Sequence, residues 1–376
     1  MSQQRPQDSE IYVAKGKPNK KLLIVTGFLI LIGVMMILSA GASKCTALGK
    51  LPIDFAWKQL ISIVVGLFLM KFFANFKYQK LLEYAVPAAW IVVVFLALID
   101  FTPLGVTVNG AKRWIALGPL QFQPSELTKP AFALLLAGAF RFNSKLFEQE
   151  KIVKYFLPCL VMALFTAMQP NLSMVIILFG VSVAMYILAG GSWQILMAAA
   201  SAGIGLIALK IKPYQLSRIV IWRHPESDPY GAGYNIIQSL LAFVSGGIFG
   251  VGYGNSKQKL EWLPEAHTDF IFAVIGEEWG FIGCLGIIWL FGMFVIEGMR
   301  ISQKAPDMFG KLLAAGLTIS IGLQACINMA VSSSAIPATG VPLPFISYGG
   351  TSVMVTMGMV GILLNISKYT LRKKHE

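Results

Sequence analysis

Asp269 stands where a polar segment meets an apolar run, and its position suits acid–base chemistry. The residues before it read LPEAHT and those after it read FIFAVIG. A carboxylate at such a boundary is partly removed from water, which raises its proton affinity and suits it to act as a general base. A helix cap at a membrane edge would use the same residue, and the residues alone leave both interpretations open.

Glu126 and Lys129 are a second pair of side chains that could do chemistry. They lie three positions apart at the start of an apolar run, so they share one helical face. Ionisable groups at or below a membrane edge are rare and usually face a cavity or a charged partner. The pair is therefore either a structural ion pair or part of a substrate cavity.

Lys112 and Arg113 lie together in the stretch NGAKRW, which glycine and proline break into turns. Arg binds phosphate as a planar fork and Lys binds it as a point charge. The two cations could therefore contact a phosphate-bearing substrate, or they could anchor the chain on lipid headgroups.

Glycines are concentrated in residues 246–254, which hold five of them. Glycine lets a backbone approach another backbone or a ligand closely. The stretch lacks the GK[ST] ending and the strand–turn–helix context of a phosphate loop, which excludes a nucleotide site of that kind.

Glu277 and Glu278 follow in the next apolar run. About 12 Å of helix would separate Glu277 from Asp269, so we expect the two glutamates to be a buried structural feature.

Residues 337–350 hold three prolines and three glycines but no charge, and they follow an apolar run. These residues prevent a continuous helix. Non-helical backbone near membrane depth is tolerated only where it is buried in protein or lines a cavity. The segment therefore predicts a pocket or groove open to the outer face.

Composition places these residues in a membrane protein. The chain has 376 residues, of which 56% are hydrophobic and 13% charged, and its mean hydropathy is +0.68. Soluble domains carry roughly 25% charged residues, so the composition excludes a cytosolic enzyme, a disordered protein and a nucleic-acid binder. The four cysteines and three histidines form no cluster of soft metal ligands.

Ten apolar runs approach the roughly 20 residues that a membrane span requires. They cover residues 22–40, 57–75, 82–100, 127–141, 153–169, 172–190, 193–210, 270–299, 312–332 and 351–368. The eighth is longer than one span needs and contains Gly280 and Gly283, so we expect it to begin as a re-entrant or interfacial segment.

Basic residues orient these spans. With both termini in the cytoplasm, 19 of the 31 basic residues fall on inner segments or adjoining span ends. The predicted fold is therefore an all-α polytopic membrane protein of about ten transmembrane helices, with a large extracytoplasmic loop between spans seven and eight. The predicted organisation is a disordered tail (1–21), a single membrane domain (22–368, with the outer loop at 211–268) and a basic tail (369–376).

Four stretches between residues 109 and 352 resemble the SEDS family of bacterial wall polymerases, named for shape, elongation, division and sporulation. They read NGAKRWI…QPSELTK, DPYGAGYNIIQSLLAFVSGGIFGVGYGNSKQKL, LPEAHTDFIFAVIGEE and PATGVPLPFISYGGTS. The sequences LPEAHTDF and SKQKL are more similar to the division and sporulation branches than to the rod-elongation branch. The cell-division branch is the most similar.

The resemblance implies a peptidoglycan glycosyltransferase that acts on lipid II at the outer leaflet. A sugar hydroxyl of the acceptor would attack the anomeric carbon of the donor and displace undecaprenyl pyrophosphate. The essential carboxylate of the family matches Asp269, whereas Glu126, Lys129 and Ser347 match positions that line its central cavity. His267 belongs to the same motif as Asp269, and we count it among the substrate-contacting residues.

The leaving group adds a requirement for positive charge. We expect Lys112, Arg113 and Arg218 to contact the pyrophosphate. Such cations, or a divalent ion such as Mg²⁺ or Mn²⁺, would stabilise its charge in the transition state. The residues themselves indicate no cofactor, and the sequence shows no set of metal ligands.

One stretch departs from the family pattern. The family often reads QPDLGT after the fifth span, and this chain reads QPNLSM at residues 169–174. Asn171 therefore lacks the usual carboxylate. This puts in doubt a charge pairing at this position, for example with Lys129. Either a different acid would hold a metal, or the asparagine accepts the same hydrogen bond.

The resemblance also implies partners in the membrane. The family works with a class B penicillin-binding protein, a transpeptidase, and with other membrane proteins of the divisome, at the division septum. Two alternatives to an enzyme are a lipid II flippase and a non-catalytic division scaffold. A flippase would favour charged groups spread through the bilayer and a repeated architecture, whereas the polar candidates here are concentrated on the outer side.

Overall fold

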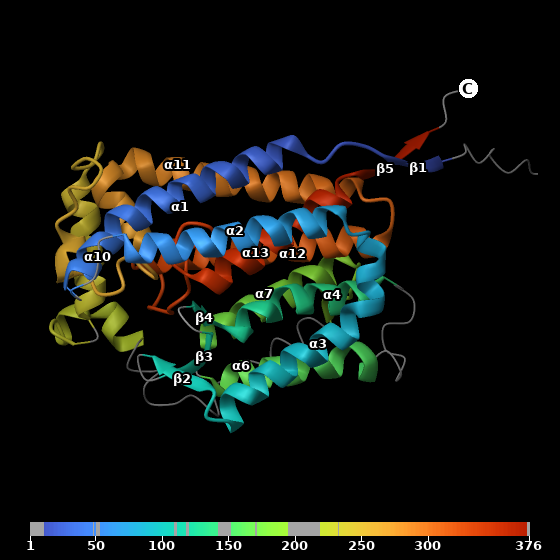
Figure 1. The fold of residues 1–376 in the computed structure, drawn as a ribbon, viewed down its shortest axis with the longest axis horizontal. Helices are drawn as coiled ribbons and strands as arrows, with labels where there is room; N and C mark the ends of the chain where they lie inside the picture. The colour runs from blue at the N-terminus through green and yellow to red at the C-terminus, as the bar shows by residue number, and fades with distance from the viewer. Residues whose placement is uncertain are drawn as a thin grey trace, which may run out of the picture.

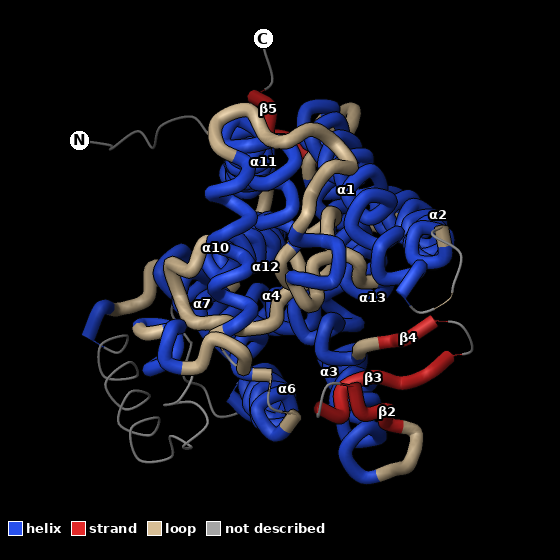
Figure 2. The backbone as a smooth tube through the Cα atoms, turned by 90° about the vertical axis from the view of Figure 1, so that its left-hand side faces the viewer, coloured by secondary structure: helices blue, strands red, loops and turns tan. Residues whose placement is uncertain are grey.

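The computed structural model shows an elongated helical bundle with the terminal strands β1 and β5 at one end (Figure 1). Helix α10 and a small sheet of strands β2 to β4 lie at the opposite end, which Figure 2 views along the bundle. The structure describes residues 11–47, 49, 53–108, 111–117, 120–141, 152–169, 171–194, 219–231 and 233–373.

Helices make up most of the described chain. The α-helices are α1 (Lys20–Ala47), α2 (Asp54–Asn75), α3 (Tyr78–Phe101), α4 (Thr128–Phe140), α6 (Leu157–Met168), α7 (Leu172–Leu188), α10 (Tyr234–Gly246), α11 (Ile271–Lys304), α12 (Met308–Ser332) and α13 (Gly350–Ile366). Short 3₁₀ or π turns are η1 (Pro124–Leu127), η2 (Ile152–Phe156), η3 (Pro225–Ser227) and η4 (Gln258–Trp262). The strands are β1 (Ile11–Lys15), β2 (Gly105–Val108), β3 (Ala111–Leu117), β4 (Leu120–Phe122) and β5 (Tyr369–Lys373).

The helices have the lengths and composition of membrane spans. Among the described residues, five helices are long and apolar enough to cross a bilayer, namely α1, α2, α3, α11 and α12. Three shorter apolar helices cover Val153–Met168, Ser173–Leu188 and Gly350–Ile366. Every predicted span except 193–210 coincides with a helix, and 195–210 lies outside the described residues.

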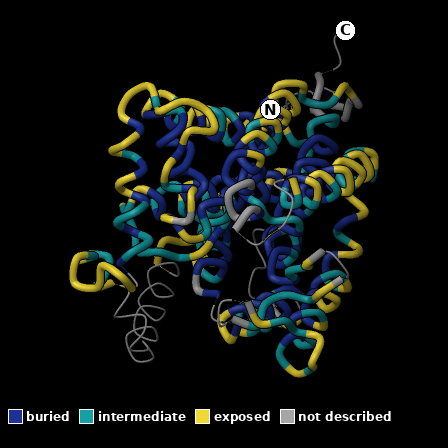
Figure 3. The backbone as a smooth tube through the Cα atoms, turned by 60° about the vertical axis from the view of Figure 1, so that its left-hand side comes forward, coloured by how far each residue is buried: buried dark blue, intermediate teal, exposed yellow. Residues whose placement is uncertain are grey.

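Buried residues gather in the interior of the bundle and exposed ones at its outside (Figure 3). The buried residues are concentrated on α4, α12, α13 and the start of α11. Helix α13 is buried along almost its whole length and packs against α2. Many large apolar side chains on α1, α2 and the second half of α11 are exposed, as expected for surfaces that contact lipid.

Helix α11 breaks at Gly280, whose φ of 67° and ψ of −165° are not helical. The glycine-rich segment 246–254 packs into this break. Phe281 donates its N–H to the Gly247 carbonyl at 2.9 Å, and Gly252 donates to the Glu278 carbonyl at 3.0 Å. The close backbone approach predicted from the glycines is thus made to protein backbone, and α11 begins with a separate short segment before the longer one.

Gly250 provides a stability test of this contact. It has a φ of 82°, and a Cβ there would lie 2.2 Å from the Glu278 carbonyl oxygen. Gly254 has a φ of 81° with nothing within 4 Å of a Cβ. We expect Gly254→Ala to cost about 1 kcal/mol of unfolding free energy through backbone strain alone, and Gly250→Ala to cost at least about 3 kcal/mol because the backbone must also move. Thermal unfolding in detergent measures both, and equal losses would contradict the packing argument.

Glu277 and Glu278 are buried structural residues, as predicted. The Glu277 carboxylate accepts N–H bonds from Lys257 at 2.9 Å and Gln258 at 3.2 Å. Glu278 pairs with Lys259 at 2.8 Å and accepts a hydrogen bond from Ser39 of α1. The two carboxylates therefore join the segment before α11 to α11 and α1.

Strands form in both terminal segments, where the sequence predicted a disordered tail over residues 1–21 and a basic tail over residues 369–376. Residues Ile11–Lys15 form strand β1, which pairs antiparallel with β5, and α1 already begins at Lys20. The reason is spatial, since α1 starts and α13 ends at the same end of the bundle. The two flanking segments can therefore satisfy their backbone groups in a ladder, a contact between distant parts of the sequence that no local pattern reveals.

The all-α prediction also omits the sheet at the opposite end. Strands β2, β3 and β4 form an antiparallel meander with an irregularity between Val106 and Thr107. The meander carries Lys112 and Arg113 on β3 and leads through η1 into α4. Helices remain the dominant structure, and the sheet serves to present these two cations.

Candidate functional site

A tight turn before α11 presents Asp269. The Glu265 carbonyl accepts N–H bonds from Thr268 and Asp269 at 3.1 Å and from Phe270 at 3.3 Å. Glu265 itself has a φ of 55°, which a residue with a side chain adopts only at a cost. The Thr268 hydroxyl bonds the Glu265 carboxylate at 2.9 Å. Backbone and side chain together therefore fix the conformation from which Asp269 projects.

The segment 337–349 packs against this turn, and its second half is mostly buried in the protein, whereas Gly340 is exposed. Val341, Leu343, Phe345 and Ile346 are all buried. The Ser347 hydroxyl donates to the Thr268 carbonyl at 2.5 Å and accepts the Leu343 N–H at 2.8 Å. Ser347 thus holds the turn through the residue next to Asp269.

His267 is buried in an aromatic contact. Its ring centroid lies 4.8 Å from that of Phe55 and 5.8 Å from that of Tyr348. Its carbonyl accepts the Tyr348 N–H at 2.9 Å. His267 therefore joins the turn to α2 and to the segment 337–349.

The Asp269 carboxyl is half-buried and electrostatically tuned. Its burial and the Glu265 carboxylate raise its pKa, the Arg113 guanidinium lowers it, and the resulting pKa is about 7. Gly340, with a φ of 71°, approaches so closely that a Cβ there would lie 3.4 Å from the carboxylate oxygen. A carboxyl with this pKa can accept a proton and release it again near neutral pH.

Arg113 and Lys112 make different contacts from neighbouring positions of β3. Arg113 donates from Nε to the Gln169 carbonyl at 2.7 Å and lies within electrostatic reach of Asp269. Lys112 donates from Nζ to the Thr102 carbonyl at 2.8 Å, at the end of α3. The structure therefore brings Arg113 to the Asp269 site and ties Lys112 to the end of α3.

Glu126 and Lys129 form an ion pair with an N–O distance of 2.6 Å, and both side chains are 1% exposed. Lys129 also donates to the Gln324 side-chain oxygen at 2.5 Å. Gln324 in turn donates to the Pro342 carbonyl at 2.8 Å. The pair thus makes a structural connection from α4 through α12 to the segment beside Asp269.

Asn171 caps α7. Its side-chain oxygen accepts the Met174 N–H at 3.4 Å, and its amide donates to the Ser125 hydroxyl at 3.4 Å. An asparagine satisfies a helix N-terminus about as well as an aspartate. Asn171 therefore makes an N-cap hydrogen bond that an aspartate at this position could also accept, without its charge.

Three residues of α12 were not among the predicted site residues, although they contact the site. The Asn328 amide donates to the Asp269 carbonyl at 2.8 Å and the Val341 carbonyl at 2.7 Å, and the Ser332 hydroxyl donates to the Asp269 carbonyl at 3.4 Å. With Gln324 they occupy one helical face at intervals of four residues. That spacing of polar side chains in an apolar helix is visible in the sequence and could have revealed them.

Arg218 lies outside the described residues, so the structure does not place it. In the part of the chain that is described, no group of three or more His, Cys, Asp or Glu side chains could hold a metal ion. Asp269 and Glu265 therefore do not amount to a complete protein ligand set.

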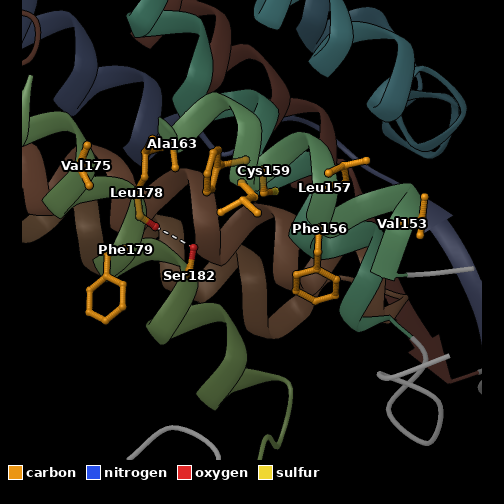
Figure 4. Close-up of a pocket in the computed structure, with 11 residues that line it drawn as sticks. Val153, Phe156, Leu157, Cys159, Ala163, Val175, Leu178, Phe179 and Ser182 are labelled. Atoms are coloured by element: carbon orange, nitrogen blue, oxygen red, sulfur yellow. Dashed lines mark hydrogen bonds between the residues drawn. The ribbon is translucent and has the colours of Figure 1, made fainter. Parts of the chain in front are cut away.

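An apolar groove of about 490 Å³ lies between α4, η2, α6 and α7. Figure 4 shows Phe156, Cys159, Leu178 and Phe179 along it, with the Ser182 hydroxyl bonded to the Leu178 carbonyl. The predicted site residues are not among its lining, so the groove is separate from the Asp269 site.

The chain is similar to known proteins over most of its length. A family model described as cell cycle protein, FTSW_RODA_SPOVE, matches residues 20–372. The probable peptidoglycan glycosyltransferase FtsW of Trichlorobacter lovleyi is 37% identical over 352 residues, which is 92% of each chain. The stage V sporulation protein E of Bacillus subtilis is 36% identical over 365 residues, covering 95% of this chain and 98% of that protein.

Solved structures share the fold. A chain of a peptidoglycan synthase complex that coordinates polymerization and crosslinking superposes with a TM-score of 0.76 at 26% identity, covering 93% of this chain and 97% of that one. The rod shape determining protein RodA of Thermus thermophilus superposes with a TM-score of 0.69 at 24% identity, covering 96% and 98%. The likeness to RodA supports the fold of a multi-pass membrane protein.

Proposed function

The chain belongs to the FTSW_RODA_SPOVE family of cell cycle proteins, and from that premise we propose that it polymerises lipid II into glycan strands as a peptidoglycan glycosyltransferase. The names of its relatives and the synthase complex that shares its fold support this activity. The observation that carries the chemistry is the clamped turn that presents Asp269 with a pKa of about 7.

The proposed reaction uses Asp269 as general base. The carboxylate takes the proton from the acceptor sugar hydroxyl, and the hydroxyl oxygen forms a bond to the anomeric carbon of the donor. The bond from that carbon to undecaprenyl pyrophosphate breaks, and its electron pair leaves with the pyrophosphate oxygen. Asp269 then releases its proton to water. With a pKa of about 7, the carboxylate is basic enough to accept the proton of the hydroxyl, and a large fraction of it is ionised near neutral pH.

Arg113 supplies positive charge beside this carboxylate. A fixed cation stabilises charge that develops on a leaving group in a water-poor site, so we assign the pyrophosphate contact first to Arg113. Lys112 and Arg218 remain proposed contacts. A divalent ion such as Mg²⁺ would bind mainly through the pyrophosphate, and no step above depends on it. Adding EDTA to the polymerisation assay tests that requirement.

The end of the bundle that carries α10 and the sheet would face the outside of the cytoplasmic membrane, with both termini in the cytoplasm. The excess of basic residues on the predicted inner segments supports this orientation. The fold shared with a chain of a synthase complex supports a class B penicillin-binding protein as partner. The FtsW relatives support a role at the division septum.

Purified protein, with and without a co-purified transpeptidase partner, tests the proposal in an assay with labelled lipid II. We expect glycan strands from the wild type and more of them with the partner. A preparation that makes no glycan but moves lipid II across liposome membranes would replace the enzyme with a flippase. A preparation that does neither with its partner present would favour a scaffold.

The pH dependence of polymerisation follows from the Asp269 environment. Because the base must be deprotonated, kcat/KM should fall below pH 7, about tenfold per pH unit. Glu265→Gln removes a neighbour that raises the Asp269 pKa, so the acid limb should move to lower pH. Arg113→Gln removes a neighbour that lowers the Asp269 pKa, so the acid limb should move to higher pH. Limbs that stay fixed in both variants would contradict Asp269 as the titrating base.

A further inference from the structure

Helix α12 carries a row of polar side chains that ends at the Asp269 backbone. Gln324, Asn328 and Ser332 are each 1% exposed or less, although α12 is an apolar helix. Residues four apart on a helix lie on one face, one turn above another. The face of these three side chains is turned towards the segment 337–349 and the turn before α11.

Each member of this row, which we call the α12 ladder, bonds backbone at the site. Gln324 holds the Pro342 carbonyl at 2.8 Å, Asn328 holds the Val341 carbonyl at 2.7 Å and the Asp269 carbonyl at 2.8 Å, and Ser332 adds a longer bond to the Asp269 carbonyl at 3.4 Å. Asn328 therefore ties Asp269 directly to the segment 337–349. Gly340 of that segment lies close to the Asp269 carboxylate and limits the space around it.

The far end of the ladder connects to the buried ion pair. Gln324 accepts a hydrogen bond from Lys129 through its side-chain oxygen while its amide donates to Pro342. The amide of a glutamine has one acceptor end and one donor end, so this residue can satisfy both neighbours at once. The contacts thus run without interruption from Glu126 and Lys129 to Asp269.

We propose that Gln324, Asn328 and Ser332 are positioning residues for the general base, fixing the Asp269 backbone against the segment 337–349 and linking it to the Glu126–Lys129 pair. The inference rests on the proposed role of Asp269. A displacement of about 1 Å in a catalytic group can cost 10²-fold in rate. A base held by its own carbonyl from a rigid helix is protected against such a displacement.

The pH profile separates a positioning role from a merely structural one. The charged groups that act on the Asp269 carboxyl are Glu265 on its own turn and Arg113 on β3. The ring of His267 on the same turn makes tilted contacts with the rings of Phe55 and Tyr348. Helix α12 and the segment 337–349 contribute neutral groups through Asn328, Ser332 and Gly340. If the turn loosens, water reaches the carboxyl and its pKa falls towards the ordinary value.

The test compares Asn328→Leu with wild type in polymerisation of labelled lipid II. We expect kcat to fall between about 10-fold and 100-fold, KM to change little, and the acid limb to move to lower pH. Ser332→Ala, which removes one longer bond, should lower kcat about 3-fold. Ser320→Ala is the matched control, since Ser320 lies on the same face one turn before Gln324 and its buried hydroxyl bonds no described group.

Each outcome decides a separate claim. If Asn328→Leu and Ser332→Ala both keep the wild-type kcat and acid limb, the ladder does not position the base. If activity falls only in proportion to the amount of folded protein, with the limb unmoved, its role is structural and the inference is overturned. Should Asn328→Leu fail to fold, Ser332→Ala against Ser320→Ala decides the question. A wild type without polymerase activity, or an active Asp269→Asn, would instead overturn the proposed function.

Discussion

Asp269→Asn is expected to lower lipid II polymerisation about 10³-fold while the protein stays folded. General base catalysis contributes typically 10²-fold to 10⁴-fold, and an amide cannot take the proton of the acceptor hydroxyl. The substitution keeps the shape of the side chain. It also leaves the backbone bonds of the turn in place, because Asn328 and Ser332 bond the residue 269 carbonyl and the Glu265 carbonyl accepts its N–H.

The same substitution should not weaken substrate binding. The carboxyl repels an anionic pyrophosphate when it is ionised, so its loss removes a repulsion. Binding of lipid II, followed by fluorescence quenching in detergent, is expected to equal or exceed that of the wild type. Loss of turnover with intact binding would mark a residue that acts in the chemical step.

Asp228→Asn is the control for this experiment. Asp228 is an exposed carboxylate in the turn before α10, where the same chemical change is made outside the site. We expect its activity to stay within about twofold of the wild type, as for most surface substitutions. Equal losses in the two variants, or an Asp269→Asn protein that polymerises normally, would remove Asp269 from the mechanism.

The sequence singled out Asp269 as a candidate general base, because a carboxylate at the junction of polar and apolar segments is a local feature. It also indicated that the eighth apolar run begins with a separate segment, because the run is too long for one span, and the structure places the break at Gly280. The buried roles of Glu277 and Glu278 followed from their depth in that run. These predictions depended on short-range patterns alone.

Contacts between distant segments could not be predicted in the same way. Ser347 was expected to line a cavity, yet its hydroxyl is bonded to the Thr268 carbonyl, 79 residues earlier in the chain. Lys112 and Arg113 are adjacent in sequence, yet Lys112 bonds the Thr102 carbonyl and Arg113 bonds the Gln169 carbonyl. This difference arises only once β3 is paired within its sheet. The pairing of β1 with β5 likewise depends on the closure of the whole bundle.

Lys129→Met is expected to destabilise the protein by about 3–5 kcal/mol, because it leaves the Glu126 carboxylate buried without its counter-charge. The ion pair is 1% exposed on both sides, so water cannot replace the lost ammonium without opening the packing at the start of α4. Unfolding by SDS titration in mixed micelles measures the change. The matched control is Lys58→Met, whose partner Asp54 lies 3.6 Å away on the surface. That change should cost less than about 1 kcal/mol.

The double variant Glu126→Gln with Lys129→Met separates stability from function. Removing both charges relieves the unpaired carboxylate, so stability should return to within about 2 kcal/mol of the wild type. Polymerisation should stay low, because the thioether that replaces the Lys129 ammonium cannot donate to Gln324, which holds the Pro342 carbonyl beside the site. A double variant as unstable as Lys129→Met would show that lost charge pairing is not the cause. Full activity in the stable double variant would show that the connection through Gln324 does not reach Asp269.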